Sequence, residues 1–160
     1  MGRPKALVDG WLAHSVQAVA ACDRVVVVLG AAADDARALL GAHRVDVVVA
    51  QDWDTGMGAS LRAGIAALAD ETRCLVTLVD LPDVGADVVR RVLAQPDTSD
   101  VLARAAYRGV PGHPVLLGRE HWPGATAGAT GDRGARDYLR AHPPVLVECG
   151  DLATGDDVDR

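Results

Sequence analysis

RVVVVLG, residues 24–30, is a short, almost uninterrupted run of β-branched residues that ends in a glycine. Two further runs have the same character: VDVVVA at residues 45–50 and CLVTLV at residues 74–79. Runs of this length and composition are typical of strands that are buried on both faces of a parallel sheet. They predict three neighbouring strands of a mostly parallel central sheet.

Apolar residues spaced three and four positions apart flank these runs, and that spacing predicts amphipathic helices. The positions concerned are Leu12, Val16 and Val19; Ala36, Leu39 and Leu40; Leu61, Ile65 and Leu68; and Val88, Val89, Val92 and Leu93. Strands that alternate with helices imply right-handed crossovers. The expected fold class is therefore α/β, a three-layer Rossmann-like domain with helices on both faces of its sheet.

The last third of the chain has a less regular pattern. Residues 101–106 and 115–117 are predicted to form two short strands joined by a loop, residues 133–141 a helix, and residues 145–149 a final strand. No repeat, charge block or linker divides the sequence, so residues 1–160 are expected to form a single domain. The chain opens with a turn-like MGRPK and a helical pattern, whereas α/β domains of this kind usually begin with a strand. We therefore expect the opening strand to be missing.

Composition narrows the class of partner. The net charge of −6 and the isoelectric point near 5.2 argue against binding to nucleic acid or to an anionic membrane, which favours a small-molecule ligand. Three widely spaced cysteines offer neither a disulfide framework nor a metal site and are interpreted as buried thiols in a reducing cytoplasm. With no signal peptide and no long apolar stretch, a cytoplasmic location is expected. Lys5 is the single lysine among 16 basic residues, a bias that is typical of a genome rich in G and C.

Three loops that follow predicted strands carry the residues most capable of chemistry, because ligands of open α/β sheets bind at the carboxyl ends of the strands. In residues 51–64 a pair of glycines, Gly56 and Gly58, precedes Ser60 at the start of a predicted helix. Glycines at a helix N-terminus let backbone N–H groups approach a phosphate or a base. An ordinary glycine turn with a serine cap explains the same residues equally well.

Asp80 directly follows the run at residues 74–79, where a carboxylate could hold Mg²⁺ between nucleotide phosphates. Capping of the next helix is the alternative. Asp132 precedes the predicted helix at residues 133–141 and has the position of an N-cap, while Arg133 and Arg136 are suited to bind phosphate.

Six short motifs together resemble a known family. They are MGRPKAL at residues 1–7, GMGASLRAG at 56–64, DLP at 80–82, GHPV at 112–115, GDRGAR at 131–136 and DLAT at 151–154. In this order they resemble the molybdenum cofactor nucleotidyltransferases, which are MobA-like NTP transferases, and within them the molybdenum cofactor cytidylyltransferase branch. The resemblance spans nearly the whole chain.

The resemblance implies a Mg²⁺-dependent nucleotidyltransferase with a Rossmann-like fold that uses CTP or GTP. In such enzymes the terminal phosphate of a molybdopterin-type cofactor attacks the α-phosphorus of the nucleotide and releases pyrophosphate. By the same resemblance, Lys5 neutralises the triphosphate, Asp80 holds Mg²⁺, and Asp132 is a second metal or acceptor-site group. The base and ribose are held by Gly56, Met57, Gly58, Ser60 and Leu61.

The sequence departs from the family in several places. The family signature starts with a strand and a glycine loop of the form LAAGxxxR before the segment like MGRPK, and the single domain is expected to lack both. Leu81 stands where the branch has Gln, and Ala153 and Gly155 replace Asp and Pro. Two other interpretations therefore stay open: a nucleotidyltransferase for a sugar phosphate or another small phosphate, and a non-catalytic nucleotide-binding partner in molybdenum enzyme maturation.

Overall fold

The computed structural model describes residues 4–8 and 10–158. Its helices are α1 (Trp11–Ala18), α2 (Ala33–Leu40), α3 (Met57–Ala66), α4 (Ala86–Leu93), α5 (Trp122–Ala127) and α6 (Arg136–Ala141). Its strands are β1 (Val26–Leu29), β2 (Asp46–Val49), β3 (Arg73–Val76), β4 (Leu102–Tyr107), β5 (Val110–Gly118) and β6 (Val145–Glu148). Short 3-10 turns are η1 (Lys5–Leu7), η2 (Trp53–Thr55), η3 (Arg119–His121) and η4 (Gly131–Arg133).

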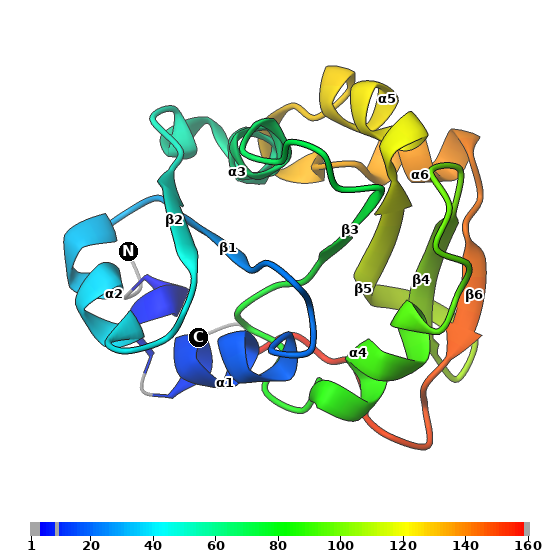
Figure 1. The fold of residues 1–160 in the computed structure, drawn as a ribbon, viewed down its shortest axis with the longest axis horizontal. Coiled ribbons are helices and arrows are strands. Elements are labelled where there is room, and N and C mark those ends of the chain that lie inside the picture. Colours follow the sequence, from blue (N-terminus) through cyan, green and yellow to red (C-terminus); the bar gives the residue numbers. More distant parts are fainter. Residues whose placement is uncertain (1–3, 9, 159–160) are drawn as a thin grey trace.

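The strands lie between two layers of helices, which confirms the α/β fold class with its three layers. Figure 1 shows α1 and α4 on one side of the strands and α3, α5 and α6 on the other. On the α4 side, Val88 and Val92 pack with Leu116 of β5 in a buried cluster. On the opposite side, Leu117 of β5 packs with Trp122 of α5. Alternate residues of β5 thus pack into the two halves of the core, as expected for a strand buried on both faces.

The sheet differs from the expectation of one mostly parallel sheet. The described strands form a two-stranded sheet, β1-β2, and a four-stranded sheet in the order β3-β5-β4-β6. β1 and β2 are parallel, as are β4 and β6, whereas β3 and β4 both run antiparallel to β5. The three runs that define the pattern therefore do not share one sheet: β1 and β2 pair with each other, whereas β3 is the edge strand next to β5 (Figure 1).

The β4–β5 hairpin is longer than predicted. Arg108 and Gly109 have φ angles of 54° and 79°, the left-handed pair that a tight hairpin turn requires. Tyr107 pairs with Val110 directly across this turn, so β5 begins at Val110 rather than near Val115. Glycine and proline at positions 111–112 suggested a loop, but the outer part of a two-stranded ribbon tolerates both.

The last helix is shorter than predicted, and this changes the interpretation of Asp132. α6 begins at Arg136 and its N-cap residue is Ala135, whereas Asp132 lies in the separate turn η4. The N-cap role suggested for Asp132 is therefore wrong. Gly134, with a φ of 51°, separates the turn from the helix.

Two predictions from composition can be compared with the fold. Cys22, Cys74 and Cys149 are free thiols; Cys149 is buried as predicted, whereas Cys22 and Cys74 are only partly buried. Within the described residues, no helix has the length and apolarity needed to cross a membrane.

Candidate functional site

An ion pair joins two predicted site residues that are far apart in sequence. The ammonium group of Lys5, in η1, donates a hydrogen bond to Asp80 Oδ2 at 2.5 Å. Asp80 is buried, with 7% of its surface exposed, whereas 41% of the Lys5 side chain is exposed. A buried carboxylate requires a charged or hydrogen-bonding partner, and Lys5 supplies one.

The loop that carries Asp80 is fixed by the end of the described chain. Val158 donates its backbone N–H to the Asp80 carbonyl at 3.0 Å. Three residues beyond Asp80, the carboxylate of Asp83 accepts two bonds from Thr154, one from its N–H at 2.6 Å and one from its hydroxyl at 2.7 Å. The DLAT segment therefore holds the DLP loop in place. These contacts leave the Asp80 carboxylate to interact with Lys5 while its backbone is anchored elsewhere.

His113 and Arg104 lie on the hairpin strands beside this loop. Arg104 of β4 is half-buried and donates from Nε to the Gly112 carbonyl at 2.9 Å. Tyr107 donates its hydroxyl to the His113 carbonyl at 2.7 Å, which fixes the backbone at that position. The pKa of His113 is lowered to about 4, chiefly by burial and also by the nearby Arg104 charge, while the Asp80 charge opposes this shift. His113 is therefore neutral at pH 7.

The shifted pKa of His113 predicts a loss of stability in mild acid. The unfolded chain takes up a proton on this imidazole near pH 6.5, whereas the folded protein does so only near pH 4. Between these values the unfolded state binds more protons, so stability falls as the pH falls through this window. We expect His113→Gln to remove up to about 3 kcal/mol of this pH dependence. Urea unfolding of both proteins at pH 7 and pH 4 measures this pH dependence. An equal loss of unfolding free energy between pH 7 and pH 4 in the two proteins would contradict the prediction.

The N-terminus of α3 is packed closely against the loop that leads into η4. Gly56 has a φ of 114°, and a Cβ at this position would lie 2.8 Å from Asp132 Oδ1 and 2.7 Å from the Gly131 carbonyl oxygen. A Cβ on Gly58 would lie 2.6 Å from the Ala129 carbonyl oxygen. Arg62, one turn further along α3, donates to that same carbonyl. Packing therefore explains why both positions are glycine: the absence of a side chain allows the Asp132 loop to approach the helix.

Substitution of Gly58 should expose this packing as a stability effect. Gly58→Ala gains about 1 kcal/mol of helix propensity, but the methyl group collides with backbone that cannot rotate away. Overpacking of this kind costs about 1–3 kcal/mol, so we expect a net loss of stability. Gly128→Ala is the matched control, since the nearest atom to its Cβ is 4.0 Å away. Urea denaturation compares them, and equal midpoints for Gly58→Ala and the unsubstituted protein would refute the packing role.

A cavity of about 900 Å³ lies beside these elements. Met57, Ser60 and Leu61 of α3 line it, and Ala6 and Val79, neighbours of Lys5 and Asp80, reach its wall. Its polar lining also includes Arg104, His113, Arg133 and Arg136. The structure thus brings Met57, Ser60 and Leu61 to one cavity, with the Lys5–Asp80 pair next to residues of its wall. Gly56, Gly58 and Asp132 belong instead to the packed junction of α3 and η4.

Arg104 is the residue that the sequence patterns did not single out. It is a charged residue within the apolar strand run VLARAAY, residues 101–107, and burial lowers its pKa. A lone charge in a strand that is otherwise apolar is the signal that could have found it, because such charges are rarely buried without a role.

The donor set around Asp80 limits how a metal could be held. No group of three or more potential ligands among His, Cys, Asp and Glu occurs in the described part of the chain. Mg²⁺ suits such a site, since it binds through one or two carboxylates and completes its shell with phosphate oxygens and water. The single buried carboxylate of Asp80 fits that mode of binding.

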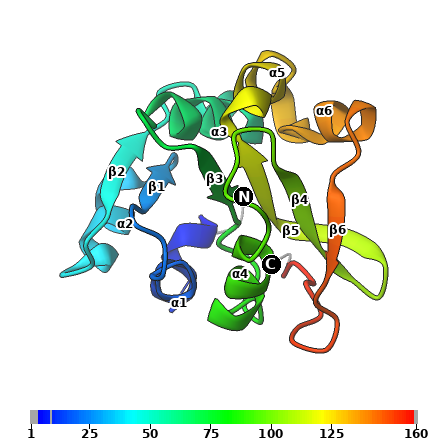
Figure 2. The same ribbon diagram turned by 45° about the vertical axis from the view of Figure 1, so that its right-hand side comes forward.

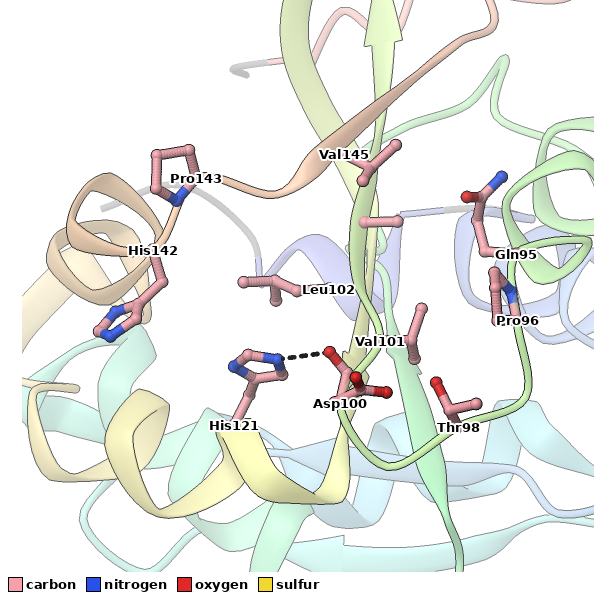
Figure 3. Close-up of a pocket in the computed structure, with 11 residues that line it drawn as sticks. Gln95, Pro96, Thr98, Asp100, Val101, Leu102, His121, His142, Pro143 and Val145 are labelled. Carbon is pink, nitrogen blue, oxygen red and sulfur yellow. Dashed lines mark hydrogen bonds between the residues drawn. The ribbon is translucent and has the colours of Figure 1, made fainter.

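A second cavity, of about 520 Å³, lies beside the starts of β4 and β6 (Figure 3). His121 lines it, and its ring nitrogens contact the Asp100 carbonyl and the Tyr138 hydroxyl, each at 2.9 Å. His142 stacks on Tyr138 at a centroid distance of 4.2 Å. The predicted site residues do not line this cavity, so the 900 Å³ cavity is the candidate functional site.

The chain is similar to several known proteins. The family model described as "MobA-like NTP transferase domain" matches residues 1–145. The chain is 38% identical over 152 residues to a nicotine blue oxidoreductase of Paenarthrobacter nicotinovorans, covering 88% of this chain and 73% of that protein. It is 23% identical over 99 residues to the molybdenum cofactor cytidylyltransferase of Escherichia coli, covering 61% and 50%. A Mycobacterium tuberculosis protein solved in complex with manganese is 28% identical, with a TM-score of 0.71 over 92% of this chain and 82% of its own.

Proposed function

The chain belongs to the MobA-like NTP transferase family, and from that premise we propose that it transfers a nucleoside monophosphate from CTP or GTP to the phosphate of a molybdopterin-type acceptor. Nucleotidyltransferase activity and a nucleoside triphosphate substrate follow from the family itself. The choice of nucleotide and acceptor rests on the ordered motifs and on the similarity to the cytidylyltransferase. The observation that carries the proposal is the Lys5–Asp80 pair, placed beside a cavity large enough for a nucleotide.

The reaction needs positioning and positive charge more than covalent help from the protein. An oxygen of the acceptor phosphate forms a bond to the α-phosphorus, the bond from that phosphorus to the bridging oxygen breaks, and pyrophosphate leaves with the electron pair. We propose that Lys5 lies against the triphosphate and offsets the charge that spreads onto its oxygens. Asp80 both orients the Lys5 ammonium and supplies a carboxylate ligand.

A divalent cation is the cofactor proposed for this site. Mg²⁺ bound at Asp80 would supply positive charge to the phosphate oxygens of the nucleotide. The manganese complex of the Mycobacterium tuberculosis relative supports divalent metal binding within this fold. Asp132 lies against Gly56 at the start of α3, and we propose for it an acceptor-site role in preference to a second metal site.

The remaining lining residues divide between the two substrates. Ser60 offers a hydroxyl, and Met57 and Leu61 offer apolar surface, for the base and ribose. Gly56 and Gly58 contribute indirectly, by allowing the Asp132 loop to pack on the helix that carries those side chains. Arg104, Arg133 and Arg136 provide local positive charge in a protein of net charge −6. Guanidinium groups bind phosphate through paired N–H donors, so these arginines suit the acceptor phosphate.

Pyrophosphate release tests the proposal. The protein is incubated with each of the four common nucleoside triphosphates, with Mg²⁺ and with either a molybdopterin-type acceptor or a hexose 1-phosphate. We expect release only with CTP or GTP and only with the pterin acceptor. Release with the sugar phosphate alone would transfer the assignment to the alternative acceptor class. Tight Mg²⁺-dependent nucleotide binding without any release would favour the non-catalytic maturation partner of a molybdenum enzyme.

A second candidate follows from the relative that is 38% identical, which is named an oxidoreductase. In that case the same cavity would bind a conjugated heterocycle, and a hydride would pass to it from a reduced nicotinamide while water supplies the proton. Oxidation of NADH or NADPH with nicotine blue, followed by absorbance, tests this directly.

A further inference from the structure

An irregular segment of the β4–β5 hairpin carries two side chains of the candidate site. The pairing register shifts between Arg104 and Ala106, where one residue of β4 lies opposite residues 112–114 of β5. We call residues 112–114 the β5 bulge; Figure 2 shows β4 and β5 side by side, with their turn projecting away from α5 and α6. Bulges re-aim side chains and are over-represented next to active sites. Arg104 and His113 both line the 900 Å³ cavity, so the β5 bulge belongs to its wall.

Hydrogen bonds fix the backbone of the β5 bulge and the side chain of Arg104. The Tyr107 hydroxyl donates to the His113 carbonyl at 2.7 Å. The Gly112 carbonyl accepts from Arg104 Nε at 2.9 Å. A Cβ at Gly112 would lie 2.8 Å from the Tyr107 ring, so glycine is what lets the ring lie this close. The guanidinium of Arg104 is therefore held through Nε, and its two terminal amino groups can donate to another partner.

Arg104 carries a half-buried charge, and no acidic side chain of the described chain forms an ion pair with it. Burial lowers the pKa of its guanidinium, and no carboxylate acts in the opposite direction. Arg133 and Arg136 line the same cavity, but both are exposed, and Arg133 contacts Asp137 at 3.2 Å. A partly buried charge without a counter-ion costs free energy. A bound anion would remove that cost, so Arg104 is the arginine of this cavity best suited to hold one.

His113 places a neutral ring beside this charge. Its bond to Tyr107 uses the backbone carbonyl, and within the described chain its ring nitrogens have no hydrogen-bond partner. Because its pKa is about 4, at pH 7 one ring nitrogen carries a proton and donates while the other accepts. The charges of Arg104 and Asp80 both act on this ring. His113 therefore lies near the predicted metal ligand as well as near the unpaired guanidinium.

We propose that Arg104 and His113 bind the terminal phosphate of the acceptor, a phosphate monoester, with the Arg104 amino groups and one His113 ring nitrogen as donors. The inference rests on the proposed function, which makes that phosphate the attacking group. A guanidinium binds two oxygens of a phosphate through paired N–H groups, and the ring N–H binds an oxygen from a second direction. His113, which had no role in the proposed reaction, becomes a substrate-binding residue.

The phosphates of the nucleotide are the other source of the same chemistry. Lys5 contacts Asp80 from η1 and is proposed to lie against the triphosphate, whereas Arg104 and His113 approach from the β4–β5 hairpin. Two substrates that both carry phosphate must be held separately and brought together at one phosphorus atom. Cationic groups on two different elements suit that requirement, which favours the acceptor phosphate for the hairpin.

Titration with phenyl phosphate tests the site without any turnover. This probe is a phosphate monoester on a flat ring, and isothermal titration calorimetry measures its Kd for the 160-residue protein. We expect Arg104→Gln to weaken binding roughly tenfold or more, the usual effect of losing a hydrogen-bonded charge. Arg44→Gln is the matched control, since Arg44 is exposed and lies before β2. Equal binding by the two variants, or no saturable binding by the unsubstituted protein, would overturn the proposal.

A pair of substitutions at His113 separates hydrogen bonding from packing. His113→Leu removes both ring nitrogens and should weaken phenyl phosphate binding about tenfold. His113→Gln keeps an N–H donor and should recover most of that loss. Circular dichroism checks that both variants fold. A similar loss in both variants, or no loss in either, would mean that the ring does not donate to the phosphate.

Competition identifies which phosphate occupies the site. Saturating CTP with Mg²⁺ should leave phenyl phosphate binding in place, because the two ligands take different sites. Abolition of phenyl phosphate binding by CTP would assign Arg104 and His113 to the nucleotide and would overturn the proposal.

Steady-state kinetics separate this inference from the proposed function. With the pterin acceptor, Arg104→Gln should raise the KM of the acceptor roughly tenfold or more and leave the KM of the nucleotide unchanged. An unchanged KM of the acceptor would refute the phosphate site alone. Absence of pyrophosphate release from every protein, with phenyl phosphate binding that still depends on Arg104, would refute the transfer reaction and leave the phosphate site standing.

Discussion

Replacement of Asp80 by Asn is expected to reduce nucleotidyl transfer by about 10³-fold or more. The substitution keeps the size of the side chain but removes the negative charge that faces Lys5 at 2.5 Å. Loss of a metal-binding carboxylate removes several kcal/mol of transition-state stabilisation, which corresponds to this factor. The backbone carbonyl that accepts from Val158 is unaffected, so the loop should keep its place.

Measurement of pyrophosphate release across a range of Mg²⁺ concentrations checks the expectation. Asp80→Asn should stay slow even at high Mg²⁺, with a circular dichroism spectrum like that of the unsubstituted protein. Asp83→Asn is the control on the same loop, because Asp83 bonds to Thr154 and not to Lys5. Unchanged turnover in Asp80→Asn would remove Asp80 from the catalytic machinery.

Local patterns predicted most elements but not how the strands pair. The apolar spacing of Leu61, Ile65 and Leu68 corresponds to α3 and the end that follows it, and RVVVVLG contains β1. Pairing depends on contacts between distant segments, and no periodicity within residues 74–79 could reveal that β3 pairs with β5. The β4–β5 hairpin has a long, regular edge on β5, and β3 pairs with that edge.

In the candidate site, too, local sequence predicted single residues but not the contacts between distant segments. Asp80 was predicted from its own loop and Lys5 from the family resemblance of residues 1–7, but only the fold shows that they pair across 75 positions of sequence. The pattern at Asp132 was typical of an N-cap, because the sequence does not show that Gly134 interrupts the helix there. Gly56 and Gly58 suggested close approach of a ligand, and what approaches them is the chain's own loop. Their residue types were informative, whereas the identity of the neighbour required the tertiary structure.

Lys5→Ala is expected to lower turnover by about 10²-fold, which is the usual effect of losing one charge contact to the transition state. In the proposed reaction the ammonium group contributes in two ways, since it contacts the buried Asp80 carboxylate and would carry charge toward the triphosphate. Removing it leaves that carboxylate without this partner, so some loss of stability should accompany the loss of rate. Thermal unfolding separates the two effects, because a stability loss alone leaves the rate per folded molecule unchanged.

Lys5→Arg sharpens the same prediction, because every other basic residue of this protein is already arginine. If positive charge were sufficient, arginine at position 5 would restore full activity. An ammonium is a compact point charge on a flexible stem, whereas a guanidinium is planar and needs more room beside a buried carboxylate. We therefore expect Lys5→Arg to recover stability but only part of the rate. Full activity in Lys5→Ala would instead mean that Arg104, Arg133 and Arg136 together bind the triphosphate, with Lys5 serving only to neutralise Asp80.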